Sequence, residues 1–307
     1  MNISEFQEYF ETNPVKVKLD LWLKSRQKSL FIKGFLGSAP AFYLHNVGYE
    51  QKKSAVFILH DEEEAGYFYN DLQQHDTGGR VFFFPSSYKK SIRSGAVKDP
   101  ANQVLRTETL NECNSSEWWT VVTYPQALAE KVVNKKRLSG ETLHLSVGER
   151  VGLQFVIDTL TEYGFEQTEF VYEPGQFSVR GSLIDVFSFS NDLPYRIDFW
   201  ADDIDSIRSF DIENQLSVDS LNSVSIISNT VNEAEGEMVP VTEFFNPDTI
   251  FCIFDIRFML DTISGIFTNN PDSEAFADAE AFESAISEHR CIEIGGRNYL
   301  KTKNTLE

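Results

Sequence analysis

Residues 169–211 constrain the fold more than any other stretch, because short alternating segments follow one another there with turn residues between them. Pro174-Gly175 opens the stretch and Asn191 to Pro194 interrupts it, and both are turn signals. Successive side chains of a β-strand point to opposite faces, so the alternating apolar residues share one face. The pattern predicts an antiparallel β-meander. The expected inner face carries Phe177, Val179, Tyr195, Ile197 and Phe199.

The opposite face of this meander carries Arg196, Asp198 and Trp200. Tryptophan and arginine are residue types that often anchor protein interfaces. One interpretation is therefore a partner-binding face, and the other is that Trp200 folds over an edge of its own domain.

Two long motifs lie in this stretch, Y-E-P-G-x-F-S-x-R-G-x-x-x-D-V-F at 172–187 and P-Y-R-I-D-F-W-x-D-x-I-D-S-I-R-x-F-D at 194–211. In both, the chain resembles the bacterial transcription-repair coupling factor and the excision-repair helicase UvrB. The resemblance implies a small β-rich domain that binds UvrA. Carried over by position, the implied contact residues are Arg180, Arg196 and Trp200, where tryptophan replaces the phenylalanine usual in the family.

A glycine turn, Gly34 to Ser38, follows the apolar segment 29–33. A phosphate-binding loop needs a lysine and a Ser or Thr in the order G-x-x-x-x-G-K-[ST]. Registered against the loop of UvrB, these positions hold proline and alanine, and proline lacks the N–H that would cradle phosphate. We therefore expect no nucleotide binding, no cofactor, and no catalytic or metal-binding residue in this chain. The degenerate nucleotide loop comprises Gly34, Gly37, Ser38, Ala39, Pro40 and Ala41.

Apolar segments alternate with helical patterns in the rest of the first half, which predicts a parallel sheet. The expected strands are 55–60, 81–84 and 119–123. The expected fold class is α/β: a parallel-sheet domain with a degenerate P-loop, similar to domain 1 of UvrB, interrupted by a small α+β domain with an antiparallel β-meander. The resemblance places the first part of the α/β domain at 1–137, the UvrA-binding domain at 138–211, and the second part of the α/β domain at 212–307.

Two local signals concern the start of the small domain. Lys135 to Gly140 reads as a linker between domains. Ser146 to Glu149 has the spacing of a capping box, which predicts a helix start at that point.

Charge is distributed unevenly along the chain, whose formal net charge is -20. Residues 1–137 hold 18 Lys and Arg against 16 Asp and Glu, whereas 138–307 hold 9 against 31. Acidic surface repels phosphate, and Lys and Arg supply most of the affinity for a DNA backbone. The second half is therefore expected to bind a protein in preference to DNA, although acidity also serves solubility alone.

A DNA-binding accessory module of a repair helicase is the alternative function. Its carriers would be Lys89, Lys90, Arg93 and Lys98 in the basic segment 89–106, which also reads as an ordinary solvated region. A metal-dependent nuclease is a weaker alternative, because carboxylates suit magnesium but Asp202-Asp203 lies at an expected hairpin tip and Asp205 would point opposite Asp203. These carboxylates are Asp198, Asp202, Asp203 and Asp205.

The three cysteines lie far apart, and the N-terminus has no signal-peptide pattern, so the chain is expected to be cytoplasmic with reduced thiols. No apolar run approaches the ~20 residues of a membrane helix, so no membrane partner is expected. The expected function is recruitment of UvrA in nucleotide excision repair of lesions that stall RNA polymerase. The resemblance further implies a fragment whose full-length family contacts RNA polymerase and DNA, and translocates on DNA with ATP, through domains absent from this chain.

Overall fold

The structure is a computed structural model that describes residues 13–35, 37, 39–44, 52–75, 79–89, 97–189, 191, 193–228, 238–270 and 274–306. By its internal contacts the chain divides into two units. Unit 1 consists of Met1–Ser86, Ser115–Val132 and Val239–Glu307, and unit 2 consists of Ser87–Asn114 and Val133–Met238.

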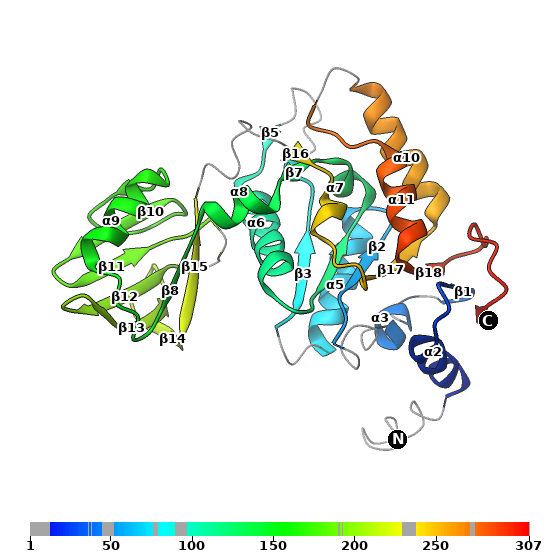
Figure 1. Ribbon diagram of the computed structural model, residues 1–307, viewed down its shortest axis with the longest axis horizontal. Coiled ribbons are helices and arrows are strands. Elements are labelled where there is room, and N and C mark those ends of the chain that lie inside the picture. The colour runs from blue at the N-terminus through cyan, green and yellow to red at the C-terminus, as the bar shows by residue number, and fades with distance from the viewer. Residues whose placement is uncertain are drawn as a thin grey trace. The chain divides into compact units, whose positions relative to one another are not determined.

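A seven-stranded parallel sheet forms the centre of unit 1, in the order β19-β1-β18-β17-β2-β6-β3 (Figure 1). Its central strands are short and largely apolar, as is usual in a parallel sheet that is covered on both faces. In β2, for example, all 4 residues are buried. The predicted parallel α/β sheet is confirmed. The strands are β1 (Ser29–Ile32), β2 (Ala55–Ile58), β3 (Val81–Phe84), β6 (Thr120–Thr123), β17 (Ile250–Phe254), β18 (Arg290–Ile294) and β19 (Thr305–Leu306).

Helices connect these strands, and several of them begin with a side-chain cap. The side chain of Asn13 accepts a hydrogen bond from the Val15 amide at 2.9 Å, and Pro14 occupies the first helical turn of α2. Asp255 follows β17 directly and accepts from the Phe258 amide at 3.0 Å, which starts α10. The helices of unit 1 are α2 (Pro14–Lys24), α3 (Ala39–Leu44), α5 (Glu62–His75), α7 (Pro125–Ala129), α10 (Ile256–Asn269), α11 (Ala279–Glu288) and the 3₁₀ helix η2 (Val241–Phe244).

Unit 2 contains a six-stranded sheet in the order β14-β13-β12-β11-β10-β9, antiparallel except for the β9–β10 pair. The predicted meander is confirmed in β10 to β13. The strands are β9 (Glu166–Gln167), β10 (Gln176–Arg180), β11 (Leu183–Val186), β12 (Tyr195–Trp200), β13 (Asp203–Phe210) and β14 (Ser217–Leu221).

Smaller elements complete unit 2 and the crossing between the units. β8 (Thr142–Ser146) pairs with β15 (Ser223–Ile227), and β4 (Tyr88–Lys89) pairs with β5 (Val97–Lys98). β7 (Val132–Val133) pairs with β16 (Met238–Val239) where the chain passes from one unit to the other. The helices are α6 (Pro100–Ser115), α8 (Lys135–Gly140) and α9 (Leu153–Glu162).

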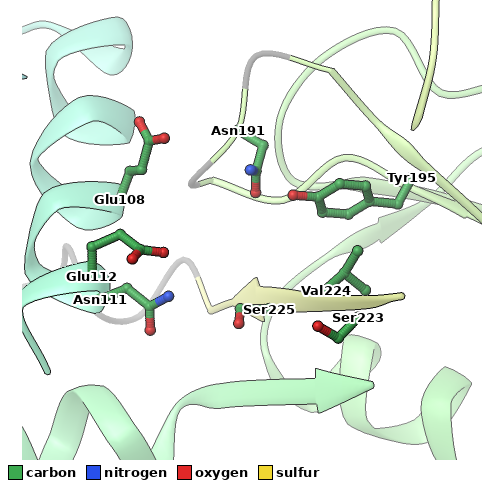
Figure 2. Close-up of a pocket in the computed structure, with 8 residues that line it drawn as sticks. All are labelled: Glu108, Asn111, Glu112, Asn191, Tyr195, Ser223, Val224 and Ser225. Carbon is green, nitrogen blue, oxygen red and sulfur yellow. The ribbon is translucent and has the colours of Figure 1, made fainter. Parts of the chain in front are cut away.

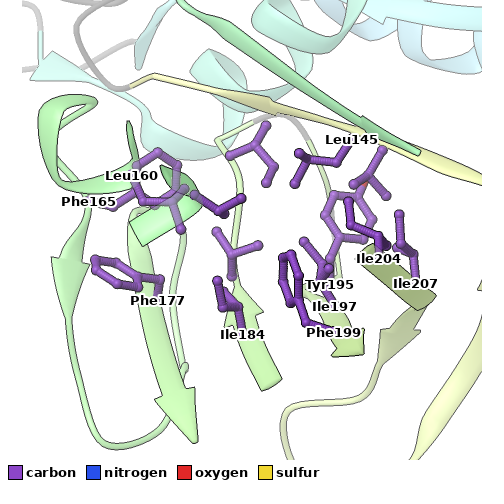
Figure 3. Packing of buried hydrophobic residues seen from close by; sticks show 14 residues of the cluster. Leu145, Leu160, Phe165, Phe177, Ile184, Tyr195, Ile197, Phe199, Ile204 and Ile207 are labelled. Carbon is purple, nitrogen blue, oxygen red and sulfur yellow. The ribbon is translucent and has the colours of Figure 1, made fainter. Parts of the chain in front are cut away.

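The core of unit 2 lies between one face of the meander, α9 and the β8–β15 pair (Figure 3). The inner side chains of β10 to β13 alternate with period two, as predicted from the sequence. Val156 and Leu160 of α9 are fully buried against this face. The cluster comprises Leu145, Val156, Leu160, Phe165, Phe177, Ile184, Val186, Tyr195, Ile197, Phe199, Ile204, Ile207, Val224 and Ile226.

Local expectations for the start of unit 2 differ from the structure. The predicted linker is a helix, α8, because Asn134 caps it by accepting from the Arg137 amide at 2.9 Å. The predicted capping box makes its carboxylate bond, from the Ser146 amide to Glu149 at 3.0 Å, but it closes a turn after β8 and starts no helix. α9 begins later, after Gly152, whose φ of 77° favours glycine.

Residues 212–227 also differ from the expectation that they return to the α/β domain. They form β14 and β15, which pair with β13 and β8 of unit 2. Unit 1 resumes at Val239, and 250–254, 290–294 and 305–306 add strands to its sheet. The physical reason is that β13 needs a partner on its far side, and the adjacent segment supplies it.

All three cysteines, Cys113, Cys252 and Cys291, are buried free thiols. Desolvation is the main cause that raises the pKa of each one. Because the thiolate is the reactive form, we expect Ellman's reagent to leave the native protein unmodified and to titrate all three thiols in guanidinium. Rapid labelling of native Cys252 or Cys291 would contradict their places in the central strands β17 and β18.

Candidate interaction surface

The face of the meander turned away from its core is called the outer face. Cross-strand register places one residue from each of five strands in a row across it. The row runs Ser178, Asp185, Arg196, Arg208 and Ser220, from β10 to β14. The sheet therefore collects charged side chains that lie far apart in the sequence.

Asp185 is the buried centre of this row, with a side chain that is 2 % exposed. Its carboxylate accepts two hydrogen bonds from Arg196, at 2.7 Å from Nε and 2.9 Å from Nη2. It also accepts a bond from Nη2 of Arg180. A two-point arginine–carboxylate pair fixes orientation as well as charge. Asp185 thus holds two of the predicted partner-binding residues in place.

Arg196 uses most of its donors inside the unit. Besides the bonds to Asp185, it donates to the carbonyl and the side-chain oxygen of Gln215, both at 3.2 Å. Its guanidinium lies 4.3 Å from the ring centroid of Phe210, and its side chain is 15 % exposed. The hydrogen bond to Asp185 is the main cause that raises its pKa. The sequence indicated this arginine as a contact residue but did not reveal that most of its hydrogen bonds are made within unit 2.

Arg180 is more accessible, at 38 % exposure, and its guanidinium lies 5.3 Å from the ring centroid of Phe170. Phe170 itself is 39 % exposed. This cation–π contact leaves an aromatic ring and a charged group side by side at the surface. Phe170 was not among the predicted site residues, since its ring meets Arg180 only through the folding of the chain before β10.

Trp200 ends β12 and is 78 % exposed. It pairs with Asp203 across the turn that joins β12 to β13, where Ala201 has a φ of 57°. The interpretation in which the indole folds over an edge of its own domain is therefore wrong. A large exposed aromatic side chain next to charged residues is a feature of protein-binding surfaces.

The degenerate nucleotide loop connects β1 to α3 as a strand-turn-helix arrangement. Gly34 and Gly37 have φ values of 90° and 58°, which require glycine's freedom. Pro40 and Ala41 lie in α3 and are buried, while Leu36 and Ser38 are outside the described residues. The helix has only 6 residues.

The basic segment is only partly described. Lys90 and Arg93 lie outside the described residues, and Lys89 and Lys98 end the short strands β4 and β5. Arg106 is 6 % exposed. For the nuclease alternative, no group of three or more His, Cys, Asp or Glu within the described ranges is arranged to hold a metal ion.

A polar cavity of about 230 Å³ lies in unit 2 beside α6 (Figure 2). Figure 2 shows the carboxylates of Glu108 and Glu112 on the helix turned toward the side chains of Asn191 and Tyr195. Burial, and after it the charge of Glu108, raise the pKa of Tyr195. The phenol therefore stays protonated to a higher pH than an exposed tyrosine would.

Over the part of the chain that the structure describes, no helix is both long and apolar enough to cross a membrane.

Comparison with known proteins identifies a UvrB interaction domain at residues 143–231. The chain is 27 % identical over 199 residues to the transcription-repair-coupling factor of Bacillus subtilis, covering 65 % of this chain and 17 % of that protein. It is 24 % identical over 207 residues to UvrABC system protein B of onion yellows phytoplasma, covering 63 % and 31 %. It is 28 % identical over 122 residues to the coupling factor of Escherichia coli, covering 40 % and 11 %. The chain thus spans less than a third of each of these relatives.

Proposed function

Because the chain carries a UvrB interaction domain and is related to transcription-repair-coupling factors and UvrB, we propose that it recruits UvrA in nucleotide excision repair. The matched residues, 143–231, include the whole meander, α9, β15 and all of β8 except Thr142. The matched domain therefore contains both faces of the sheet. One face packs the core, and the outer face leaves Arg180 and Trp200 accessible to a partner although Asp185 is buried.

The observation that carries this proposal is the set of exposed arginine and aromatic side chains on the outer face, around a buried arginine–carboxylate centre. Arg180 and Trp200 are 38 % and 78 % exposed, so a partner can reach both. Arginine and tryptophan are over-represented among residues whose truncation costs most binding energy. We therefore assign Arg180 and Trp200 to direct contact with UvrA. Arg196 would contact UvrA only through its small exposed part, and its main role would be to position Asp185.

We further propose that this chain is non-catalytic and takes no cofactor. We also propose that the repair process it serves acts on lesions that stall RNA polymerase, and that RNA polymerase and DNA are not bound by the matched region. The alternative is DNA binding through Lys89, Lys90, Arg93 and Lys98, which an affinity for duplex DNA that falls steeply with salt would favour.

Magnesium-ATP is expected to give no heat of binding when titrated into this chain. The reason is that Pro40 and Ala41 stand where the lysine and the hydroxyl residue of a phosphate-binding loop are required. A matched titration into a UvrB with an intact loop serves as the positive control. Saturable binding of ATP in the micromolar range would contradict the proposal.

Co-elution in size-exclusion chromatography tests the recruitment of UvrA. The chain and UvrA from the same organism are mixed near 10 μM, an amount that reveals complexes with a dissociation constant of about 1 μM or tighter. We expect a complex without any added nucleotide or polymerase. Separate elution of the two proteins would overturn the proposed function.

A further inference from the structure

Cationic side chains are scarce in the UvrB interaction domain, and most of them lie on the outer face. Between residues 138 and 228 the sequence contains four Lys or Arg residues. Three of them, Arg180, Arg196 and Arg208, lie on the outer face, and the fourth is Arg150. In a half of the chain with 31 Asp and Glu against 9 Lys and Arg, three of the few cations thus gather on the outer face, beside Asp185 and Asp198.

Arg208 is the member of this group whose donors are least used. Its nearest ion-pair partner is Asp198, with 3.9 Å between Nη2 and Oδ2, a separation longer than a hydrogen bond. Its Nε is buried and has no hydrogen-bond partner among the residues that the structure describes. An arginine has five N–H donors, and leaving a buried one unpaired is unfavourable. Its neighbour Arg196, in contrast, makes four hydrogen bonds inside the unit.

The positions of Arg196 and Arg208 give a second, electrostatic reason why an anionic group would be favourable beside Arg208. They are direct cross-strand partners, and like charges opposite each other in a sheet repel. The carboxylate of Asp185 is already shared by Arg196 and Arg180. Asp198, the nearest carboxylate to Arg208, lies beyond hydrogen-bond distance. A partner's carboxylate that bonds the exposed part of the Arg208 guanidinium would therefore relieve the repulsion.

The surroundings of Arg208 are open to a partner. Its side chain is 33 % exposed. On β14 the outer-face residues next to it are Ser220, its cross-strand partner, and Val218, which is 53 % exposed. A partner that covers this point would remove both an apolar side chain and part of the guanidinium from water, which strengthens a charged hydrogen bond.

We propose that Arg208 is a contact residue whose guanidinium binds a carboxylate side chain of UvrA. The inference rests on the proposed function and deepens it, since it assigns the intermolecular ion pair to Arg208 and leaves Arg196 mainly a positioning residue. An aspartate or glutamate suits this contact, because two parallel N–H bonds from the planar guanidinium match a carboxylate.

Calorimetric titration of UvrA with the whole chain and its variants tests this contact. Arg208→Ala is expected to weaken binding about tenfold or more, and Arg208→Lys is expected to recover only part of that loss because an ammonium lacks the planar fork. The melting temperature of both variants should match that of the wild type, because the buried Nε of Arg208 makes no hydrogen bond within the described residues. The control is Arg257→Ala in unit 1, whose side chain is 70 % exposed and pairs with Asp261.

The outcomes separate the inference from the proposed function. No binding by the wild-type chain overturns both. Binding by the wild type with an unchanged affinity of Arg208→Ala overturns the inference alone. A loss of affinity accompanied by an equal loss in the control, or by a lower melting temperature of Arg208→Lys, would also overturn it, because the effect would then not come from a local contact.

Discussion

Replacing Asp185 with alanine is expected to lower the free energy of unfolding of unit 2 by about 3 to 5 kcal/mol, the usual effect of removing one partner of a buried ion pair. The carboxylate is 2 % exposed, and Arg196 opposite it is 15 % exposed. Without it, the two guanidinium groups of Arg180 and Arg196 would face each other with no charge between them. Hydrogen–deuterium exchange of the β11 and β12 amides measures the effect in this unit.

Asp205 offers a matched control for this substitution. It lies on β13 of the same sheet and is exposed. We expect Asp205→Ala to change the free energy of unfolding by less than about 0.5 kcal/mol, as is usual for exposed positions. If Asp185→Ala were as stable as Asp205→Ala, the arginine–carboxylate centre would not be a determinant of this fold.

The second large effect concerns binding. Trp200→Ala is expected to weaken binding of UvrA by about 2 kcal/mol or more, roughly thirtyfold, if the indole is a central anchor. Its stability should be unchanged, because a side chain that is 78 % exposed contributes little to the core. The matched control is Phe155→Ala on α9, an aromatic residue that is 55 % exposed and lies on the helix that packs on the inner face. Equal affinity of the two variants would place the interface elsewhere.

The sheets of both units could be predicted because their signals are local. Alternation with period two identified β10 to β13, and continuous apolar runs identified β2, β3 and β6. These patterns reflect which faces meet water, and each pattern can be seen within the sequence of a single strand.

The contacts of the site could not be predicted because they depend on register. Asp185 and Arg196 lie 11 residues apart in the sequence and become Cα partners only through the pairing of β11 with β12. The resemblance indicated Arg180, Arg196 and Trp200 as contacts, but no pattern showed that one carboxylate holds both arginines. Arg208 lies inside the second motif, and its unused donors become apparent only when its neighbours are known.

The boundaries of helices and turns at the start of unit 2 were the least predictable feature, because they too depend on strand pairing. The signals at Lys135–Gly140 and at Ser146–Glu149 were real, since Asn134 and Glu149 both make capping-type bonds. Whether such a bond starts a helix or closes a turn depends on the pairing of the next residues, and after Glu149 the chain pairs with β13 through Arg150 and Asp203. Tertiary pairing thus overrides the local signal.

The most direct test of the central claim, that the outer face binds UvrA, is a calorimetric titration of UvrA with the double variant Arg180→Ala, Trp200→Ala beside the wild type and Phe155→Ala. Both outer-face side chains are accessible, so their loss should leave the fold intact. We expect saturable binding by the wild type and by Phe155→Ala, and a loss of more than about a hundredfold for the double variant. Wild-type affinity of the double variant, with an unchanged melting temperature, would contradict the account.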